Sequence, residues 1–278
     1  MNIKTILAQP IPDQQIMLEY KKNYRSYPLI TAYKSSDEPL ADIAQYGIAG
    51  QSYYSRPNAT GQPLDEVSPQ IYVRKSIAER LSEINYALQE SSEITKLFGK
   101  RVELYLDEGV RTQAMQKKLY AEVFPRLIRE QFPAMKASEA SARRDQLIAK
   151  PSNSLSPSPH ATGAAIDVKL RFACPELGFV PHSFISMGHQ GAHVGQATSV
   201  SYFETFMPTK TADKLARRNR RILYWVMRGA LLGKDTDFIV NPTEVWHWSH
   251  GDQMWAALTH APCAFYGTAY TSDSSIAG

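Results

Sequence analysis

One stretch of the chain, Ser158-Pro-His-Ala-Thr-Gly-Ala-Ala-Ile-Asp-Val-Lys-Leu170, combines the pattern of a central strand with potential metal ligands. Its second half alternates, as a strand with one buried face does. Ile166, Val168 and Leu170 are expected on one side, and Gly163, Ala165 and Asp167 on the other. The small residues beside Asp167 would leave room there for a metal ion and a substrate.

A second motif, Glu244-Val-Trp-His247, follows about eighty residues later. Alternation predicts strands at 237–240 and 244–248, joined as a hairpin by a turn at 241–243. A helix is predicted before them at 212–232, ending at Gly233. A short helix beginning near Gly251 is expected to close the domain, and the tail from 268 to 278 is expected to be flexible.

Upstream of both motifs, apolar periodicity predicts a helix over 73–97 that stops at Gly99. A strand over 102–106 follows and ends in a turn that delivers Arg111. Helices are expected at 112–131, kinked at Pro125, and at 137–148. Residues 149–159 suggest a loop at the rim of a site, and 1–65 suggest irregular chain or short strands. Residues 174–208 receive no assignment. Helices and antiparallel strands in blocks indicate an α+β fold.

Composition indicates a soluble globular protein of 278 residues with a net charge of +4. The densest basic cluster, 217–221, lies within a predicted helix and is interpreted as a solvated face, so no nucleic-acid partner is expected. Cys174 and Cys263 are interpreted as reduced thiols. The N-terminus lacks a signal-peptide core, and no stretch approaches the ~20 apolar residues of a membrane helix. These features predict a cytoplasmic protein, or a periplasmic one if a leader has been removed.

Three side chains of the two motifs form a candidate zinc site. Catalytic zinc takes three protein ligands from His nitrogen and Asp or Glu oxygen and keeps one position for water. His160, Asp167 and His247 meet this requirement, with one Zn²⁺ per chain. The other histidines are interpreted as structural, although His250 lies close to the second motif.

Hydrolysis at such a site also needs a base, for which Glu244 is the candidate. Glu244 and His247 would face opposite sides of a regular strand, so Glu244 is predicted at a turn or bulge beside it. Arg111, at the exit of its strand, is the candidate for stabilising an oxyanion or binding a substrate carboxylate. Trp246 is expected in the core or the wall of the pocket.

The order Ser-x-His-x-x-Gly-x-Ala-x-Asp and then Glu-x-Trp-His resembles the D-alanyl-D-alanine dipeptidases, the zinc peptidase family that includes the vancomycin-resistance dipeptidase. Similar segments at 58–61, 72–75, 107–111, 220–227 and 247–255 extend the resemblance over about 45–265. It implies a single zinc peptidase domain, with a 1–44 extension, in which an antiparallel sheet is flanked by helices as in hedgehog-type domains. It also implies the ligands, base and arginine named above, with Ser158 binding the amino end of the substrate.

One position departs from the family pattern. Where the dipeptidases commonly carry an Asp before Met-Gly, this chain has Ser186 before Met187 and Gly188. A buried ammonium without a carboxylate partner is costly. We therefore expect a substrate that differs from D-Ala-D-Ala at its amino end, with Ser186 at the substrate site.

The sequence favours a zinc-dependent dipeptidase that hydrolyses a D-Ala-D-Ala-like dipeptide or a related small amide. A peptidoglycan D,D- or L,D-carboxypeptidase and an amide hydrolase of a specialised pathway are the alternatives. A non-catalytic zinc-binding module is disfavoured by the presence of Glu244 and Arg111. No membrane partner is expected, and the oligomeric state is left open, a homodimer included.

Overall fold

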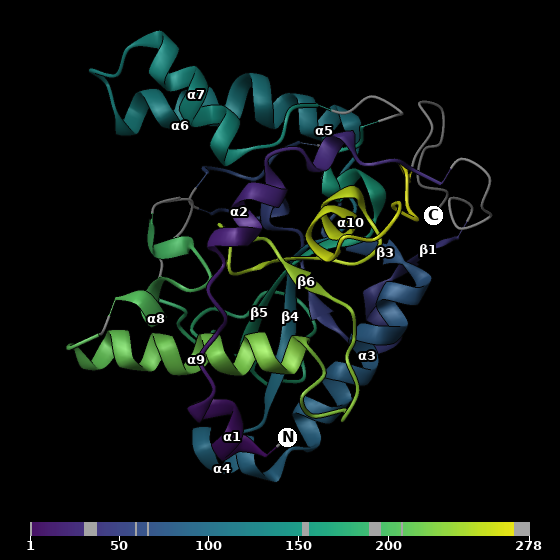
Figure 1. Ribbon diagram of the computed structural model, residues 1–278, viewed down its shortest axis with the longest axis vertical. Coiled ribbons are helices and arrows are strands. Elements are labelled where there is room, and N and C mark those ends of the chain that lie inside the picture. Colours follow the sequence, from purple (N-terminus) through teal and green to yellow (C-terminus); the bar gives the residue numbers. More distant parts are fainter. Residues whose placement is uncertain are drawn as a thin grey trace.

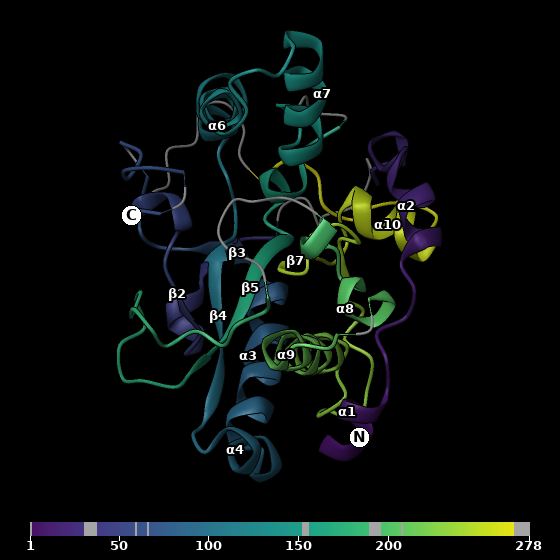
Figure 2. The ribbon, with the colours of Figure 1, turned by 90° about the vertical axis from the view of Figure 1, so that its left-hand side faces the viewer.

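A five-stranded sheet lies at the centre of the protein (Figures 1 and 2). The computed structural model describes residues 2–30, 38–58, 60–65, 67–151, 156–188, 196–206 and 208–269. In spatial order the strands are β2 (Ala49–Gly50), β4 (Val102–Glu108), β5 (Ala165–Phe172), β7 (His247–Ser249) and β6 (Ile239–Val240).

The sheet is antiparallel, as predicted, except at one edge, where β2 runs parallel to β4. Parallel neighbours need a crossover connection, and the chain between these two strands contains helix α3 (Lys75–Glu90). A separate pair, β1 (Leu40–Asp42) with β3 (Tyr72–Arg74), is also antiparallel. The α+β class is therefore confirmed, and the wholly antiparallel sheet is not.

One face of the sheet packs on two long helices, α3 and α9 (Thr211–Met227) (Figure 2). Ile166, Val168 and Leu170 of β5 are fully buried in this core, which confirms the face predicted for them. Burying each such side chain is worth about 1.5–3 kcal/mol. The apolar core thus fixes which face of β5 carries Asp167.

The predicted helix over 73–97 is two helices, because the chain turns at Ser91. That residue ends α3 in an extended conformation and caps α4 (Ser92–Phe98) by accepting a hydrogen bond from the Ile94 amide at 3.3 Å. Gly99 ends α4 with φ of +73°, as its type predicted.

Helices α5 (Gln113–Lys118), α6 (Phe124–Gln131) and α7 (Ala137–Leu147) form an arm at one end of the sheet (Figure 1). A π-helical turn over Leu119–Val123 joins α5 to α6 immediately before Pro125. The irregularity predicted at Pro125 is therefore a π-helical turn. Pro125 lies in the first turn of α6, where its missing N–H removes no hydrogen bond within the helix.

The N-terminal segment contains two helices that sequence periodicity did not predict, α1 (Ile3–Ala8) and α2 (Gln15–Lys21). Each spans fewer than eight residues, too short for a clear apolar repeat, and tertiary contacts stabilise such helices. α1 packs on α9, and α2 packs on α10 (Gln253–Thr259). The remaining α-helix, α8 (Tyr202–Thr205), also lies against α9.

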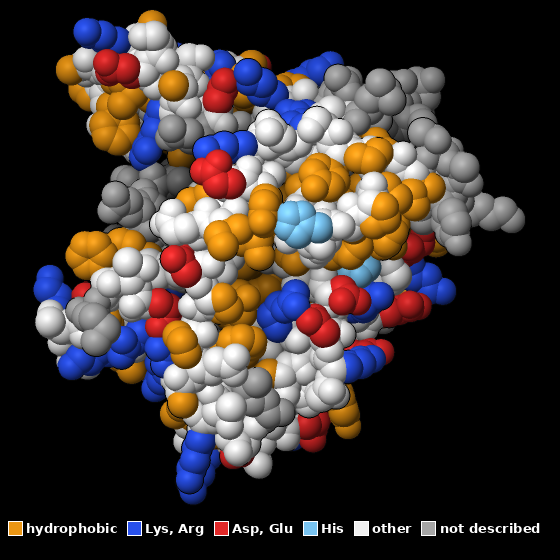
Figure 3. Space-filling model, viewed as in Figure 1, with side chains coloured by type: hydrophobic (Ala, Val, Ile, Leu, Met, Phe, Trp, Pro, Cys, Tyr) orange, Lys and Arg blue, Asp and Glu red, His pale blue; other side chains and the backbone are white. Residues whose placement is uncertain are grey.

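The basic cluster on α9 is not a solvated face. Arg220 is buried and donates to the carbonyl oxygens of Met187, Ser199 and Ala197, while Arg221 pairs with Glu204 at 2.6 Å. These guanidinium groups satisfy loop carbonyls that would otherwise be buried without donors. On the face shown in Figure 3, basic side chains are interspersed with acidic and apolar ones.

Cys174 and Cys263 are both free thiols, and none of the helices in the described ranges is long and apolar enough to cross a membrane. The tail expected to be flexible lies almost wholly outside the described residues, which end at residue 269.

Gly109 joins the end of β4 to the site loops, and a side chain there has no room. A Cβ on Gly109 would lie 2.5 Å from the Tyr72 carbonyl oxygen and 2.7 Å from Ile71. We expect Gly109→Ala to lower the free energy of unfolding by about 1–3 kcal/mol, measured by urea denaturation. The control is Gly267→Ala, where nothing lies within 4 Å of the added Cβ. Equal stability of the two variants would contradict this packing account.

Candidate metal centre and catalytic pocket

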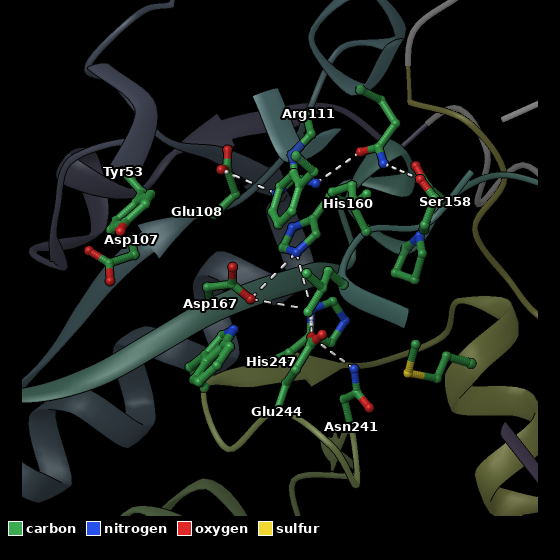
Figure 4. A pocket seen from close by; sticks show the side chains of 18 of the residues that line it. Tyr53, Asp107, Glu108, Arg111, Ser158, His160, Asp167, Asn241, Glu244 and His247 are labelled. Atoms are coloured by element: carbon green, nitrogen blue, oxygen red, sulfur yellow. Dashed lines mark hydrogen bonds and ion pairs between the residues drawn. The ribbon is translucent and has the colours of Figure 1, made fainter. Parts of the chain in front are cut away.

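The three predicted ligands meet at one point above the sheet (Figure 4). His160 Nε2 lies 3.1 Å from His247 Nδ1, and Asp167 Oδ1 lies 3.4 Å and 3.2 Å from those two nitrogens. A tetrahedral zinc ion with bonds of ~2.0–2.1 Å separates its ligands by about 3.3 Å. The three atoms therefore already form one face of a zinc coordination tetrahedron.

Strand register sets this triangle. Asp167 on β5 is directly opposite His247 on β7 in the antiparallel ladder, so both side chains leave the same face of the sheet. His160 sits just before β5 in a short 3-10 turn over Pro159–Thr162. Gly163 ends that turn with φ of +72°, a conformation that favours glycine, and lets the chain enter β5 directly.

The ring of His160 is oriented by the Gly109 carbonyl, which lies 2.9 Å from Nδ1. A proton on Nδ1 leaves the lone pair of Nε2 free to face the other two ligands. Burial lowers the pKa of His160 to about 4, so this imidazole is neutral at neutral pH. A neutral ring is the form that binds a metal ion.

Of the other two ligands, His247 is buried and Asp167 is partly buried, with 19% of its side chain exposed. Among the described residues, Asp167 Oδ1 and His247 Nε2 have no hydrogen-bond partner. Burial favours a raised pKa for Asp167, but the facing His160 and His247 hold the pKa well below its usual range. A carboxylate anion that lies between two imidazoles, with one oxygen buried, suits a divalent cation. The donor set therefore fits zinc.

Glu244 lies in the turn before β7, as predicted, although the strand begins at His247 rather than at 244. Its Oε2 is 3.7 Å from His247 Nδ1 and accepts a hydrogen bond from Asn241 Nδ2 at 2.9 Å. Asn241 is buried, and its Oδ1 accepts from the Thr243 amide at 3.2 Å. Asn241 therefore both shapes the turn and aims the Glu244 carboxylate at the metal ligands.

Arg111 enters from the opposite side, beyond His160 (Figure 4). Its guanidinium is buried and donates to Gln116 Oε1 at 2.9 Å and to Glu108 Oε2 at 3.4 Å. Its backbone amide donates to the His160 carbonyl at 3.0 Å, which ties the arginine loop to the first ligand. Arg111 is thus a cation fixed from two sides.

A bulge places Glu108 in this network. The β4–β5 register shifts between Leu106 and Glu108, and consecutive Asp107 and Glu108 both line the cavity. Burial raises the pKa of Glu108 to about 7, against the pull of the Arg111 cation. Asp107 pairs with Arg56 at 2.5 Å and with Lys169.

The cavity over the ligands has a volume of about 250 Å³. Ser158 and Trp246, the predicted substrate contacts, both line it. Ser186 does not: it is exposed, its hydroxyl accepts from the Gly188 amide, and its backbone is held by Asn219 on α9. The structure therefore does not bring Ser186 to the site, and residues 189–195 lie outside the described ranges. His250 is buried against Phe238 and Trp255, away from the cavity lining.

Several lining residues were not singled out from the sequence. Glu108 stands three positions before Arg111, a spacing that could have suggested their pairing, and Asn241 follows a strand in an Asn-Pro-Thr turn. Lys21 and Tyr24 reach the cavity from the N-terminal segment, and no local signal in the sequence predicts that contact.

Part of the chain is similar in sequence to a curated protein. The chain is 31% identical over 133 residues to a D-alanyl-D-alanine dipeptidase of Synechocystis sp.. The match covers 44% of this chain and 49% of that protein, so the chain spans about half the length of the relative. The predicted resemblance to the D-alanyl-D-alanine dipeptidase family is confirmed over this aligned part. No protein-family model matches the chain.

Two solved structures also align with the chain. One is a variant of the vancomycin-resistance D,D-pentapeptidase VanY in complex with Zn(II), at 15% identity and a TM-score of 0.33. The other is VanYB in complex with D-alanine-D-alanine, at 14% identity and a TM-score of 0.32. Each alignment covers 72% of this chain, and 85% and 84% of the respective structures. TM-scores this low do not establish a shared fold.

The ligand geometry predicts that zinc stabilises the folded protein. Adding Zn²⁺ to chelator-treated protein should raise Tm, because a metal that binds only the folded state stabilises it. Asp167→Asn should remove most of that rise, while Asp213→Asn on α9, away from the cavity, should keep it. Calorimetry of both variants tests this. An undiminished zinc response in Asp167→Asn would contradict the assignment.

The same zinc response should weaken in acid. Burial favours a lowered pKa for His247, but Asp167 and Glu244 raise it above the usual value. A raised pKa means that a proton competes with the metal ion for this ring at a higher pH. The zinc-dependent rise in Tm should be full at about pH 8 and much smaller at about pH 5. A rise of equal size at both pH values would exclude His247 as a ligand.

Proposed function

We propose that this protein is a zinc-dependent dipeptidase with one Zn²⁺ per chain, acting on a D-Ala-D-Ala-like dipeptide or a related small amide. One observation carries the proposal. A His–Asp–His triangle of the right size for zinc faces a cavity in which Glu244 lies on one side and Arg111 on the other. The D-alanyl-D-alanine dipeptidase relative supports the choice of substrate class.

His160, Asp167 and His247 would hold the ion, which when bound lowers the pKa of a water molecule and polarises the substrate carbonyl. Glu244 then acts as general base. Its carboxylate takes a proton from the attacking water and later returns it to the leaving amine. The Asn241 amide keeps Oε2 aimed at the reacting atoms through both transfers.

Arg111 would stabilise the negative charge that develops on the substrate oxygen. Its guanidinium is fixed by Gln116 and Glu108 before the reaction begins, so little reorganisation is needed. The arginine also lies in a buried site, where an electrostatic interaction is stronger than in water. In this proposal, Glu244 and Arg111 would thus lie on opposite sides of the substrate carbonyl.

The cavity volume of about 250 Å³ favours a small substrate over a peptidoglycan chain. Lys21 and Tyr24 line it from the N-terminal segment, and Phe124, Leu147 and Ile148 line it from the arm. A carboxypeptidase of the cell wall would need an open groove for a long polymer. We extend the proposal to a fold of the hedgehog and D,D-peptidase type, and to Ser158 and Trp246 as substrate contacts.

The reaction is tested with a panel of D,D-, L,D- and N-blocked dipeptides, assayed with and without chelator. At least one unprotected dipeptide should be cleaved, and the chelator should abolish the cleavage. Glu244→Gln should lower kcat by at least about 10²-fold while zinc content is retained, because it removes only the proton acceptor. Turnover of wild-type level in Glu244→Gln would eliminate Glu244 as the base, and chelator-resistant cleavage would eliminate the metal mechanism.

Replacing Arg111 separates its two possible roles. Arg111→Met should lower kcat by about 10²–10³-fold with little change in KM, because an oxyanion partner acts on the transition state. Zinc content and Tm, measured in parallel, show whether the variant remains folded. A change confined to KM would instead assign Arg111 to binding a substrate carboxylate.

A further inference from the structure

The N-terminal segment forms one wall of the catalytic cavity. It is fixed against α10 by the Gln253 amide, which donates to the Tyr27 carbonyl at 2.5 Å. Arg25 holds the opposite rim through Ser156, with Nε 2.9 Å from Oγ and Nη2 2.6 Å from the carbonyl oxygen. From this anchored segment, Lys21 and Tyr24 reach the cavity lining.

Lys21 brings a positive charge into that wall without a charged partner. Its Nζ donates to Thr243 Oγ1 at 2.7 Å, and none of the ion pairs of the described residues includes it. Burial lowers the pKa of Lys21, and the nearby Glu244 carboxylate opposes that shift. A half-buried ammonium that uses one of its three donors on a hydroxyl can bind an anion strongly.

The contacts of Lys21 fix the side of the site on which it lies. Thr243 Oγ1 is 3.0 Å from Asn241 Oδ1, and the Nδ2 of the same amide holds Glu244. Lys21 is therefore on the Glu244 side of the metal ligands, whereas Arg111 is on the His160 side (Figure 4).

The chemistry of that side identifies its ligand. Glu244 returns a proton to the leaving amine, so the leaving residue of the substrate must lie next to it. In a dipeptide, the carbon bonded to that nitrogen also carries the terminal carboxylate. The carboxylate therefore enters the cavity within a few bond lengths of the base, where an anion needs a cation to offset its lost hydration.

We propose that Lys21 binds the carboxylate of the residue released by cleavage and thereby selects substrates with a free carboxyl terminus. This inference rests on the proposed dipeptidase function. Lys21 would act as a specificity residue, and the Thr243 hydroxyl would hold the ammonium in place before the substrate binds. The N-terminal wall would thus distinguish a dipeptide, which has a free carboxylate, from an internal peptide bond, which has none.

The test compares D-alanyl-D-alanine with its C-terminal amide on the zinc-loaded, full-length protein. The wild type should prefer the acid. Lys21→Met should raise KM for the acid about 10- to 100-fold, the range of a lost charge-assisted hydrogen bond, and leave the amide almost unchanged. Lys21→Arg should retain most of the preference. The matched control is Lys22→Met, because that neighbour is exposed and pairs only with Glu19 on the surface.

A structural role for Lys21 gives a different result. If Lys21→Met impaired the acid and the amide equally, the lysine would only support the Thr243 turn, and the proposal would be overturned. An unaltered preference would overturn it as well. Binding of both compounds to the Glu244→Gln variant, with and without Lys21→Met, is measured by calorimetry. That measurement decides the role of Lys21 even if no panel compound is cleaved, so failure of the inference and failure of the dipeptidase function remain distinct.

Discussion

The pairing of Asp167 with His247 across β5 and β7 is the constraint on which the site depends. Side chains alternate between faces along a strand, so a slip of one residue would turn either ligand into the apolar core. The core prevents this, because Ile166, Val168 and Leu170 must stay against α3 and α9. Apolar packing on one face of the sheet therefore fixes the positions of the polar ligands on the other face.

The polar face of the sheet carries charged groups whose removal from water costs free energy, a cost that an apolar core does not have. Glu108 and Arg111 are buried as a pair, and the partly buried Asp167 carboxylate lies between two imidazoles. Buried ion pairs contribute little net stability, since desolvation offsets their attraction. Their value here is orientation: Glu108 fixes the guanidinium, and the Gly109 carbonyl fixes His160. The backbone amide of Arg111 donates to the His160 carbonyl, which ties the loop of the cation to the loop of the first ligand.

Features that depend on neighbouring residues were predictable from the sequence. The alternation of β5, the glycine stop after α4 and the position of Glu244 in a turn all follow from neighbouring residues. Features that depend on contacts between residues far apart in the sequence were not predicted. α1 and α2 are too short to show periodicity and form because α9 and α10 receive them. Arg220 was misinterpreted as solvated because its three carbonyl partners lie in a loop far along the chain. Ser186 stands where the family commonly has an aspartate, but it does not line the cavity.

The residues of the site therefore fall into two groups, those that sequence motifs predicted and those that only the fold brings to the cavity. The ligands, the base and the arginine were predicted from short motifs in the sequence. The wall that carries Lys21 belongs to the N-terminal segment, and only folding brings Lys21 to Thr243. Transition-state groups must keep fixed positions around the scissile bond, whereas a wall need only match the rest of the substrate. For the proposed dipeptidase, we therefore infer that substrate selection can differ through the N-terminal segment while the metal ligands, Glu244 and Arg111 stay the same.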